Sequence, residues 1–258
     1  MDSLKEKLSL LKLSSMGSQL ERVLQQCADK NIALLGGLEL LVDLELEGRR
    51  ERAVERRFRL SRLYAKPSID QFNFNHHKSR AQCKTRILSL LELDFIRRGT
   101  NIVLIGNPGT GKTFLAQIIG WKACQQNHRV LFTTAMDMLN QLLASNVDHS
   151  LARKLKVYTE PTVLVCDELG YLSLDQQTSN LFYQVISARY AAHRSSVITT
   201  NTAFSEWGNI LFNTTIASAI ADRLVENSQV LLLGGDSLRK AKKGRSDHDS
   251  GATASAAL

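Results

Sequence analysis

Residues 101–113 read NIVLIGNPGTGKT, and this stretch decides the fold. NIVLI is an unbroken apolar run, which predicts a strand buried on both faces. The next eight residues match G-x-x-x-x-G-K-[ST], and FLAQIIGWKAC, which follows, predicts a helix. Glycines between a strand and a helix let successive backbone amides point at one anion, and the helix N-terminus adds partial positive charge. The predicted phosphate-binding loop consists of Gly106, Asn107, Pro108, Gly109, Thr110, Gly111, Lys112 and Thr113.

Four side chains in and after this loop are expected to do chemistry on ATP. Lys112 is expected to reach the β- and γ-phosphates, and the Thr113 hydroxyl to ligate Mg²⁺. Further along, TVLVCDEL (Thr162–Leu169) is an apolar strand that ends in two acids. We expect Asp167 to hold Mg²⁺ through water and Glu168 to deprotonate the attacking water. The acid pair favours hydrolysis over transfer to a small acceptor, because water needs its own base.

The next predicted strand, in VITTN (Val197–Asn201), ends in a polar residue. An asparagine at such a position more often caps a turn. Beside the two motifs above, Asn201 is interpreted as a contact to the γ-phosphate or to the attacking water.

Apolar runs with helix-like stretches between them continue through the rest of the chain. Together with NIVLI they predict an α/β fold, with a five-stranded parallel sheet flanked by helices. The other four predicted strands are residues 129–134, 162–166, 196–200 and 229–233.

The N-terminal part of the chain is predicted to be helical. Apolar residues from Leu8 to Cys27 recur at three- and four-residue spacing. Gly36 and Gly37 are expected to break this pattern, and a second helix is expected from about Leu38 to Tyr64, ended by Pro67. In the following linker, Phe72 and Phe74 are expected to dock on a neighbour, Ser79 to cap a helix and Gly99 to end it.

The second helix carries seven arginines and two glutamates between residues 49 and 62. A solvated helix with Glu–Arg pairs is one reading of this run. Two glutamates cannot neutralise seven arginines, so a face that binds DNA phosphates is favoured. The candidate contacts are Arg49, Arg50, Arg52, Arg56, Arg57 and Arg59.

Composition narrows the class of protein further. The net charge is +8, of which +6 lies in residues 1–99 and +3 in residues 237–258, so basic segments flank a nearly neutral centre. This asymmetry suggests nucleic acid as a partner. No apolar run approaches the roughly 18 residues that span a bilayer, so no membrane contact is expected. The four cysteines lack metal-site spacing, which favours reduced thiols and a cytoplasmic location.

GNPGTGKT, VLVCDELGYL, VITTNTAFSEWGNI, ADRL and GDSLR together resemble the AAA+ ATPases of the DnaC/IstB branch. LFTTAMDMLNQL and LELEGRRERAVERRFRLSRLYAKPSIDQFNF are similar to IstB-type transposition helper proteins in particular. The resemblance extends from about residue 8 to residue 242. It implies an ATP-dependent homo-oligomer, with ATP at subunit interfaces, that binds duplex DNA and partners a transposase of the same insertion sequence.

The resemblance also implies roles for individual residues. Lys112 and Thr113 match Walker A, Asp167 and Glu168 match Walker B, and Asn201 matches sensor 1. Arg223 matches the arginine finger that reaches a neighbouring subunit's nucleotide, and Arg239 matches the sensor 2 arginine. The implied divisions are a basic helical N-terminal domain (1–66), a linker and helix (67–99), an ATPase core (100–236), and a sensor 2 segment with a disordered tail (237–258). The few polar residues after Arg239 predict a helical lid that is reduced or absent.

Three other functions remain open at this point. A replicative helicase loader of the DnaC type would have nearly the same core but prefer single strands, for which the two aromatic residues in 1–66 provide little stacking surface. A binding module that senses ATP without hydrolysis is disfavoured by Asp167 and Glu168. A small-molecule kinase would leave Glu168 and Arg223 without a purpose.

Overall fold

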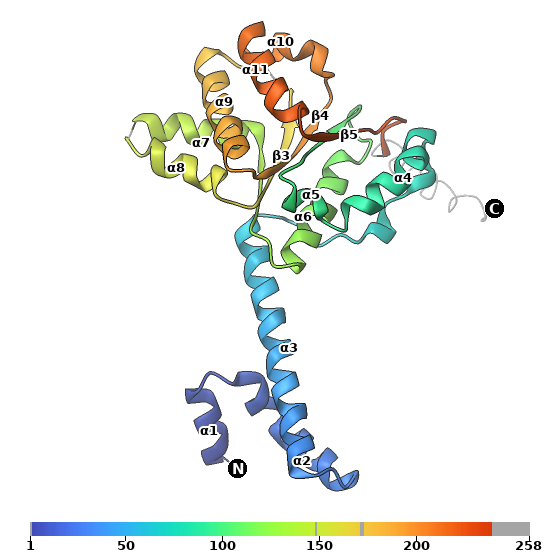
Figure 1. The fold of residues 1–258 in the computed structure, drawn as a ribbon, viewed down its shortest axis with the longest axis vertical. Helices are drawn as coiled ribbons and strands as arrows, with labels where there is room; N and C mark the ends of the chain where they lie inside the picture. Colours follow the sequence, from blue (N-terminus) through green and yellow to red (C-terminus); the bar gives the residue numbers. More distant parts are fainter. Residues whose placement is uncertain (1, 148, 171–172, 239–258) are drawn as a thin grey trace, which may run out of the picture. The chain divides into compact units, whose positions relative to one another are not determined.

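The computed structural model describes residues 2–147, 149–170 and 173–238 of the chain. These residues form two compact units, which divide between Arg57 and Phe58 (Figure 1). Helix α3 (Leu34–Ser61) begins in the first unit and ends in the second. Each unit is described below by itself.

The first unit is helical, as predicted. It contains α1 (Asp2–Leu10), α2 (Ser14–Asp29) and most of α3. Apolar residues at helical spacing on α2 turn inward, together with single residues from α1 and α3. The resulting small core consists of Leu8, Met16, Leu20, Val23 and Leu41.

The predicted break at Gly36 and Gly37 is wrong, because α3 continues through both glycines. A Cβ atom on Gly37 would lie 2.8 Å from the Cys27 sulfur, and one on Gly48 would lie 2.0 Å from the Ser15 hydroxyl oxygen. Glycine therefore lets α3 approach α2 closely at two places. This packing offsets the roughly 1 kcal/mol that glycine costs in a helix.

The second unit contains the predicted parallel sheet. Its strands are β1 (Asn101–Ile105), β2 (Val130–Thr134), β3 (Val163–Leu169), β4 (Ser195–Thr200) and β5 (Ser228–Leu232). The strand order is β2-β3-β4-β1-β5, and every neighbouring pair is parallel. The five predicted strands are confirmed, with starts within one residue of the expected positions. β3 extends three residues past the predicted end, through both acids.

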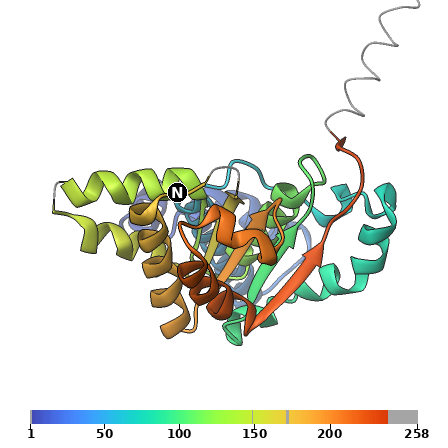
Figure 2. The same cartoon turned by 90° about the horizontal axis from the view of Figure 1, so that it is seen from above.

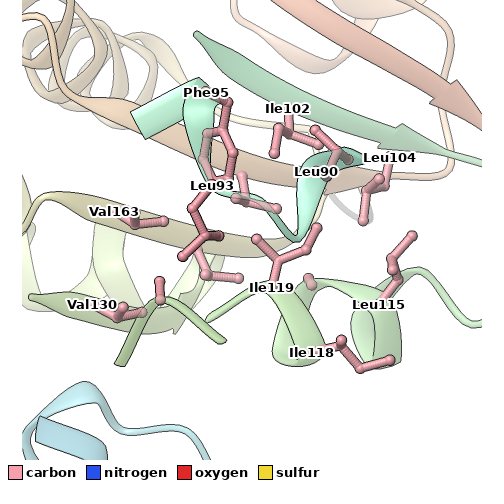
Figure 3. Close-up of a cluster of buried hydrophobic side chains, with 14 of the residues drawn as sticks. Leu90, Leu93, Phe95, Ile102, Leu104, Leu115, Ile118, Ile119, Val130 and Val163 are labelled. Carbon is pink, nitrogen blue, oxygen red and sulfur yellow. The ribbon is translucent and has the colours of Figure 1, made fainter. Parts of the chain in front are cut away.

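Alternate residues of the strands enter two separate apolar clusters, because successive side chains point to opposite faces of a sheet. Ile102 and Leu104 of β1 join one cluster, whereas Val103 joins the other. Figure 3 shows the first cluster, in which Leu115 and Ile119 of α6 point toward β1. Burial on both faces explains why the strands are continuous apolar runs rather than alternating ones.

Helices cover both faces of this sheet. The first cluster includes side chains of α4 (Lys78–Leu90), α5 (Asp94–Arg97) and α6 (Lys112–Gln125). At the sheet edge α4 lies beside β5 (Figure 2). The opposite face is covered by α7 (Ala135–Val147), α8 (Leu151–Thr159), α9 (Gln176–Ala191), α10 (Trp207–Ile210) and α11 (Thr214–Val225).

The segment between α3 and β1 packs into the second unit. Phe72 is buried, and Phe74 packs against the same cluster, as predicted. The short 3-10 turns η1 (Ile69–Gln71) and η2 (Phe74–His76) lie within this segment, and η3 (Phe204–Glu206) follows β4.

Three helix ends in this region test the sequence predictions. The predicted cap at Ser79 is wrong, because the His77 ring caps α4 by accepting from the Ser79 amide. The end of α3 comes before Pro67, at Ser61, where Arg62 adopts a left-handed φ of 59°. The single helix expected between Ser79 and Gly99 is wrong, because α4 ends at Leu90 and Leu93 adopts a left-handed φ of 62° before α5; Gly99, with φ 64°, follows α5.

A buried arginine joins the amino ends of β3 and β4. Arg189 of α9 is 1% exposed and donates to the backbone carbonyls of Tyr158, Pro161 and Ser195 and to the Ser196 hydroxyl. Burial lowers the pKa of Arg189 to about 9, so the guanidinium stays protonated at neutral pH. The carbonyls supply the acceptors that a buried cation requires.

Candidate nucleotide-binding site

The predicted phosphate-binding loop joins β1 to α6. Gly109 and Gly111 have φ angles of 81° and 87°, which only glycine adopts readily, and Gly111 is the N-cap of α6. A Cβ on Gly106 would lie 2.1 Å from the Leu233 carbonyl oxygen, so that position requires glycine for a different reason, which is space. The loop thus brings the amides of the α6 N-terminus to the carboxyl edge of the sheet.

Lys112, the first residue of α6, folds back over this loop. Its Nζ donates to the carbonyl oxygens of Gly106 at 2.7 Å and Asn107 at 2.9 Å, and the residue is 7% exposed. The Thr110 hydroxyl also donates to the Asn107 carbonyl, at 2.8 Å. The ammonium group is therefore held over the loop, where a phosphate bound to the α6 amides would lie.

Asp167 is the centre of a hydrogen-bond network at the end of β3. The Thr113 hydroxyl donates to its Oδ1 at 2.9 Å, and the Thr199 hydroxyl of β4 donates to the same oxygen. Asp167 is 4% exposed. The structure thus brings the two predicted Mg²⁺ ligands into direct contact.

This pair of oxygen donors suits Mg²⁺, which prefers hard oxygen ligands and commonly takes only one or two protein carboxylates beside substrate phosphates. Within the described part of the chain, no group of three or more His, Cys, Asp or Glu side chains could form a self-contained metal site. The donor set therefore fits an ion shared with a nucleotide.

Glu168 lies next to this network in an unusual backbone conformation. Its φ is 61°, and the pairing of β3 with β4 shifts register between Cys166 and Leu169. The Glu168 amide donates to the Thr199 hydroxyl at 3.0 Å. A bulge of this kind re-aims a side chain that regular alternation would place differently. Glu168 is exposed and lines the cavity beside the loop.

That cavity has a volume of about 750 Å³. One wall is formed by Lys112, Thr113, Glu168 and Thr199. The segment before and within α4 also contributes to the lining, with Tyr64, Gln71, Phe72, Asn73, His76 and Arg80. Cavities of roughly 300–1,000 Å³ accommodate drug-sized ligands, a range that includes nucleotides.

Arg80 is a site residue that the sequence reasoning missed. It is fully buried, and it donates to the carbonyls of Asn73 and of Thr110 in the loop. Its guanidinium also lies 4.8 Å from the centre of the Phe72 ring, and its Nε is buried without a hydrogen-bond partner. Burial lowers the pKa of Arg80. No local motif marks this arginine, because its partners lie up to 30 residues away.

Two other predicted residues lie apart from this cavity's lining. Asn201 follows β4 and is exposed, and its side-chain oxygen accepts from the Thr202 hydroxyl at 3.1 Å. The neighbouring Thr199 and Thr200 line the cavity instead. Arg223 of α11 donates to the Ala219 carbonyl at 2.8 Å and stacks over the Tyr183 ring at 4.9 Å.

The chain after β5 lies across the phosphate-binding loop. The Leu238 amide donates to the Gly109 carbonyl at 3.0 Å, and the His76 ring contacts the Asp236 carbonyl at 2.7 Å. Arg239, the expected sensor 2 residue, and the expected reduced lid fall outside the described residues. The last described residue is nevertheless in contact with the loop.

Two of the six candidate DNA-binding arginines hold the first unit together. Arg49 Nε donates to Glu45 at 2.9 Å, and Arg52 Nη2 donates to the same carboxylate at 3.0 Å. Glu45 is 3% exposed and also accepts from the amides of Ser15 and Met16 at the start of α2. The hydrogen bond from Arg49 is the main reason that the pKa of Glu45 lies below its usual value. Arg49 and Arg52 thus have a structural role whatever else they bind.

The other four arginines are distributed along the rest of α3. Arg50, Arg56 and Arg59 are exposed, and Arg57 is half-buried.

Comparisons with a family model and with individual proteins point to the same family. A family model described as IstB-like ATP binding protein matches residues 6–246. The chain is 36% identical to the ATP-binding protein of insertion sequence IS5376 from Geobacillus stearothermophilus, over 90% of this chain and 92% of that protein. It is 32% identical to the ATP-binding protein of insertion sequence IS21 from Pseudomonas aeruginosa, over 94% and 91%.

Two solved structures with a similar fold are a helicase loader and a DnaA protein. The DnaC helicase loader superposes with a TM-score of 0.58 at 22% identity, covering 67% of this chain and 99% of that one. AMPPCP-bound DnaA from Aquifex aeolicus gives 0.57 at 16% identity, covering 76% and 58%. At these identities the likeness shows a shared fold and carries no role to this chain. Among the described residues, no helix is long and apolar enough to cross a membrane.

Proposed function

The chain belongs to the family of IstB-like ATP-binding proteins, and from this premise we propose that it is an ATPase that helps a transposase to act on DNA. In this proposal it binds ATP with Mg²⁺, assembles on duplex DNA, engages the transposase of its insertion sequence and hydrolyses ATP. The ATPase part is supported by the contact of Thr113 and Thr199 with Asp167 and by the one cavity that both Lys112 and Glu168 line.

Each residue around that cavity has a defined task in the proposal. Thr113 and Asp167 would hold Mg²⁺, which supplies charge neutralisation on the phosphates when bound. Lys112 exchanges its two carbonyl acceptors for phosphate oxygens, and the loop amides bind the remaining ones. Glu168 accepts a proton from the water that attacks the γ-phosphorus atom. Asn201 orients that water if the turn that now holds its side chain opens toward the cavity.

In the proposed oligomer, Arg223 of one subunit acts at the nucleotide of its neighbour. Arg223 stacks on Tyr183 and does not line its own chain's cavity. In the proposal it reaches the nucleotide of a neighbouring subunit and stabilises charge on the transferring phosphoryl group. Arg239 is proposed to contact the nucleotide of its own chain, because residue 238 already bonds to the loop.

DNA binding is proposed to use the exposed arginines of α3. Phosphate contacts carry no sequence information, so binding should be almost independent of sequence and should weaken steeply with salt. Arg50Gln/Arg56Gln double variants should bind duplex DNA more weakly and with a flatter salt slope. Arg97→Gln with Arg98→Gln is the matched control, because it removes the same charge from exposed arginines at the end of α5. Equal loss in both variants would refute a specific role for α3.

A helicase loader is the second candidate, since the fold of the DnaC helicase loader superposes on this chain. Such a protein should bind single strands and stack bases on aromatic rings. The region 1–66 contains two aromatic residues, of which Phe58 is half-buried in an edge contact with Trp121 and Tyr64 is 69% exposed. One exposed ring provides little stacking surface, which favours duplex binding and therefore the transposition role.

One experiment tests the proposed function as a whole. Sizing or electron microscopy compares the protein with ATP, ADP and no nucleotide, on duplex and on single-stranded DNA. Assemblies that require both ATP and duplex DNA support the proposal, and Glu168→Gln should make them persist. Glu206→Gln is the control, because Glu206 is exposed and does not line the cavity. Assembly on single strands alone would favour the loader.

A further inference from the structure

Helix α6 carries one polar side chain in a stretch that is otherwise apolar and buried. Residues 115–120 read LAQIIG, and all six are buried. The polar one, Gln117, is 3% exposed. Its neighbours Leu115, Ile118 and Ile119 pack in the first apolar cluster (Figure 3). Burying an amide is unfavourable unless hydrogen bonds replace those that it made with water.

The Gln117 amide lacks such hydrogen bonds within the chain. Among the described residues, no backbone or side-chain group bonds to it. The residue lines the same cavity as Lys112, Thr113 and Glu168. An apolar side chain would fill this position without the cost of an unpaired amide. We therefore expect the partner of Gln117 to be something that enters the cavity.

Helix geometry places Gln117 on the side of the cavity where the candidate Mg²⁺ ligands lie. It follows Thr113 by four residues, so both side chains lie on one face of α6, one turn apart. Long side chains on a helix lean toward its N-terminus and cover the preceding turn. The amide therefore extends toward Thr113, whose hydroxyl donates to Asp167 at 2.9 Å. It bonds to neither residue, so it lies one layer outside this pair.

A hydrated cation is the occupant that suits a neutral acceptor in this position. Mg²⁺ retains several waters when it binds to one or two protein oxygens and to phosphates. The O–H groups of these waters need acceptors, and the carbonyl oxygen of the Gln117 amide is one that no protein donor uses among the described residues. Groups that bind the ligands of a metal strengthen its binding without touching it.

We propose that Gln117 accepts a hydrogen bond from a water in the hydration shell of Mg²⁺ and so strengthens binding of the ion beside the nucleotide. The inference rests on the ATP and Mg²⁺ site proposed above and adds a residue to it. Gln117 is then a positioning residue, because it acts on the ion through water.

A metal titration tests this role without measuring hydrolysis. ATP binding to the full-length protein is followed by calorimetry in EDTA and at increasing Mg²⁺ concentrations. Gln117→Met should need about 10–100-fold more Mg²⁺ for the half-maximal effect on ATP binding. Its ATP affinity in EDTA should equal that of the wild type. Gln117→Glu keeps an acceptor oxygen and should need no more Mg²⁺ than the wild type.

A matched control and the possible outcomes separate this role from others. Gln125→Met makes the same change at an exposed position of α6 that does not line the cavity, and it should behave like the wild type. An unchanged Mg²⁺ requirement in Gln117→Met would overturn the inference and leave the proposed ATP site intact. Weaker ATP binding in EDTA would overturn it by assigning Gln117 to the nucleotide. Wild-type ATP binding that ignores Mg²⁺ would refute the metal part of the proposed function and this inference with it.

Stability of the nucleotide-free protein provides a second readout. Gln117→Met should raise the denaturant midpoint, because it removes an unpaired buried amide and keeps the length of the side chain. Gln125→Met should leave the midpoint unchanged. A lower midpoint in Gln117→Met would show that the amide has a partner inside the fold, which would overturn the inference.

Discussion

Replacing Thr199 by valine should impair ATP hydrolysis, because valine keeps the shape of the side chain but removes the hydroxyl that makes two hydrogen bonds in the site. The Thr199 hydroxyl donates to the Asp167 carboxylate and accepts from the Glu168 amide, and the residue is 1% exposed. A bond to a charged group contributes about 1.5–3 kcal/mol, and a neutral one about 1 kcal/mol. The variant should therefore lose about 2–4 kcal/mol of unfolding free energy, measured by denaturant titration.

The effect on hydrolysis should be larger than the loss of stability implies. Glu168 has a left-handed φ of 61°, a conformation that costs about 1–3 kcal/mol unless its surroundings hold it. Without the Thr199 bond the bulge can relax, and a displacement near 1 Å can lower a rate about 10²-fold. Steady-state ATP hydrolysis should fall by about that factor.

Two controls make this prediction refutable. Thr199→Ser keeps the hydroxyl and should recover most of the activity. Thr133→Val makes the same change at a buried threonine whose hydroxyl donates to the Thr134 carbonyl. It should be far milder. If Thr199→Val hydrolyses ATP like the wild type, or if Thr133→Val is equally harmful, the network does not position Glu168.

The remaining predictions concern single charged residues. Lys112→Ala should abolish ATP binding in a direct titration, because the ammonium contact to the phosphates is lost. Arg80→Met should weaken nucleotide binding, and Arg80→Lys should recover it only in part, since a lysine cannot reach the Asn73 and Thr110 carbonyls at once. Equal nucleotide affinity in the wild type and both variants would show that Arg80 has only a structural role. Arg189→Met should lower the unfolding free energy by about 3–5 kcal/mol without changing ATP affinity in the folded protein, because buried carbonyls lose their donors. Arg223→Ala should bind ATP but hydrolyse it about 10³-fold more slowly, and mixing it with Lys112→Ala on DNA should restore part of the activity; no recovery despite proven co-assembly would refute a role in trans.

Features that depend on local pattern could be predicted from the sequence. The five strands are apolar runs on both faces, and the loop from Gly106 to Thr113 has a spacing that only a phosphate site requires. The contact of Thr113 with Asp167 follows from these two motifs, because the loop and the end of β3 share one edge of the sheet.

Features that depend on distant partners could not be predicted. Gly37 looks like a helix breaker until α2 is placed against it. The bulge at Glu168 depends on a hydroxyl of the neighbouring strand, 31 residues away. Arg80 resembles any surface arginine in the sequence, although in the fold it is fully buried.

The polar groups of the site already bind one another, which determines how a nucleotide can gain affinity. Lys112 donates hydrogen bonds to two loop carbonyls, and Asp167 accepts hydrogen bonds from two threonine hydroxyls. Arg80 donates to the Thr110 carbonyl. Binding a phosphate therefore exchanges hydrogen bonds instead of adding them. The gain comes from replacing neutral carbonyl acceptors with charged phosphate oxygens, since charge-assisted bonds are roughly twice as strong as neutral ones. Affinity should then follow the charge of the phosphate chain more than the contacts of the base, and a switch based on loss of the γ-phosphate becomes physically available to this fold.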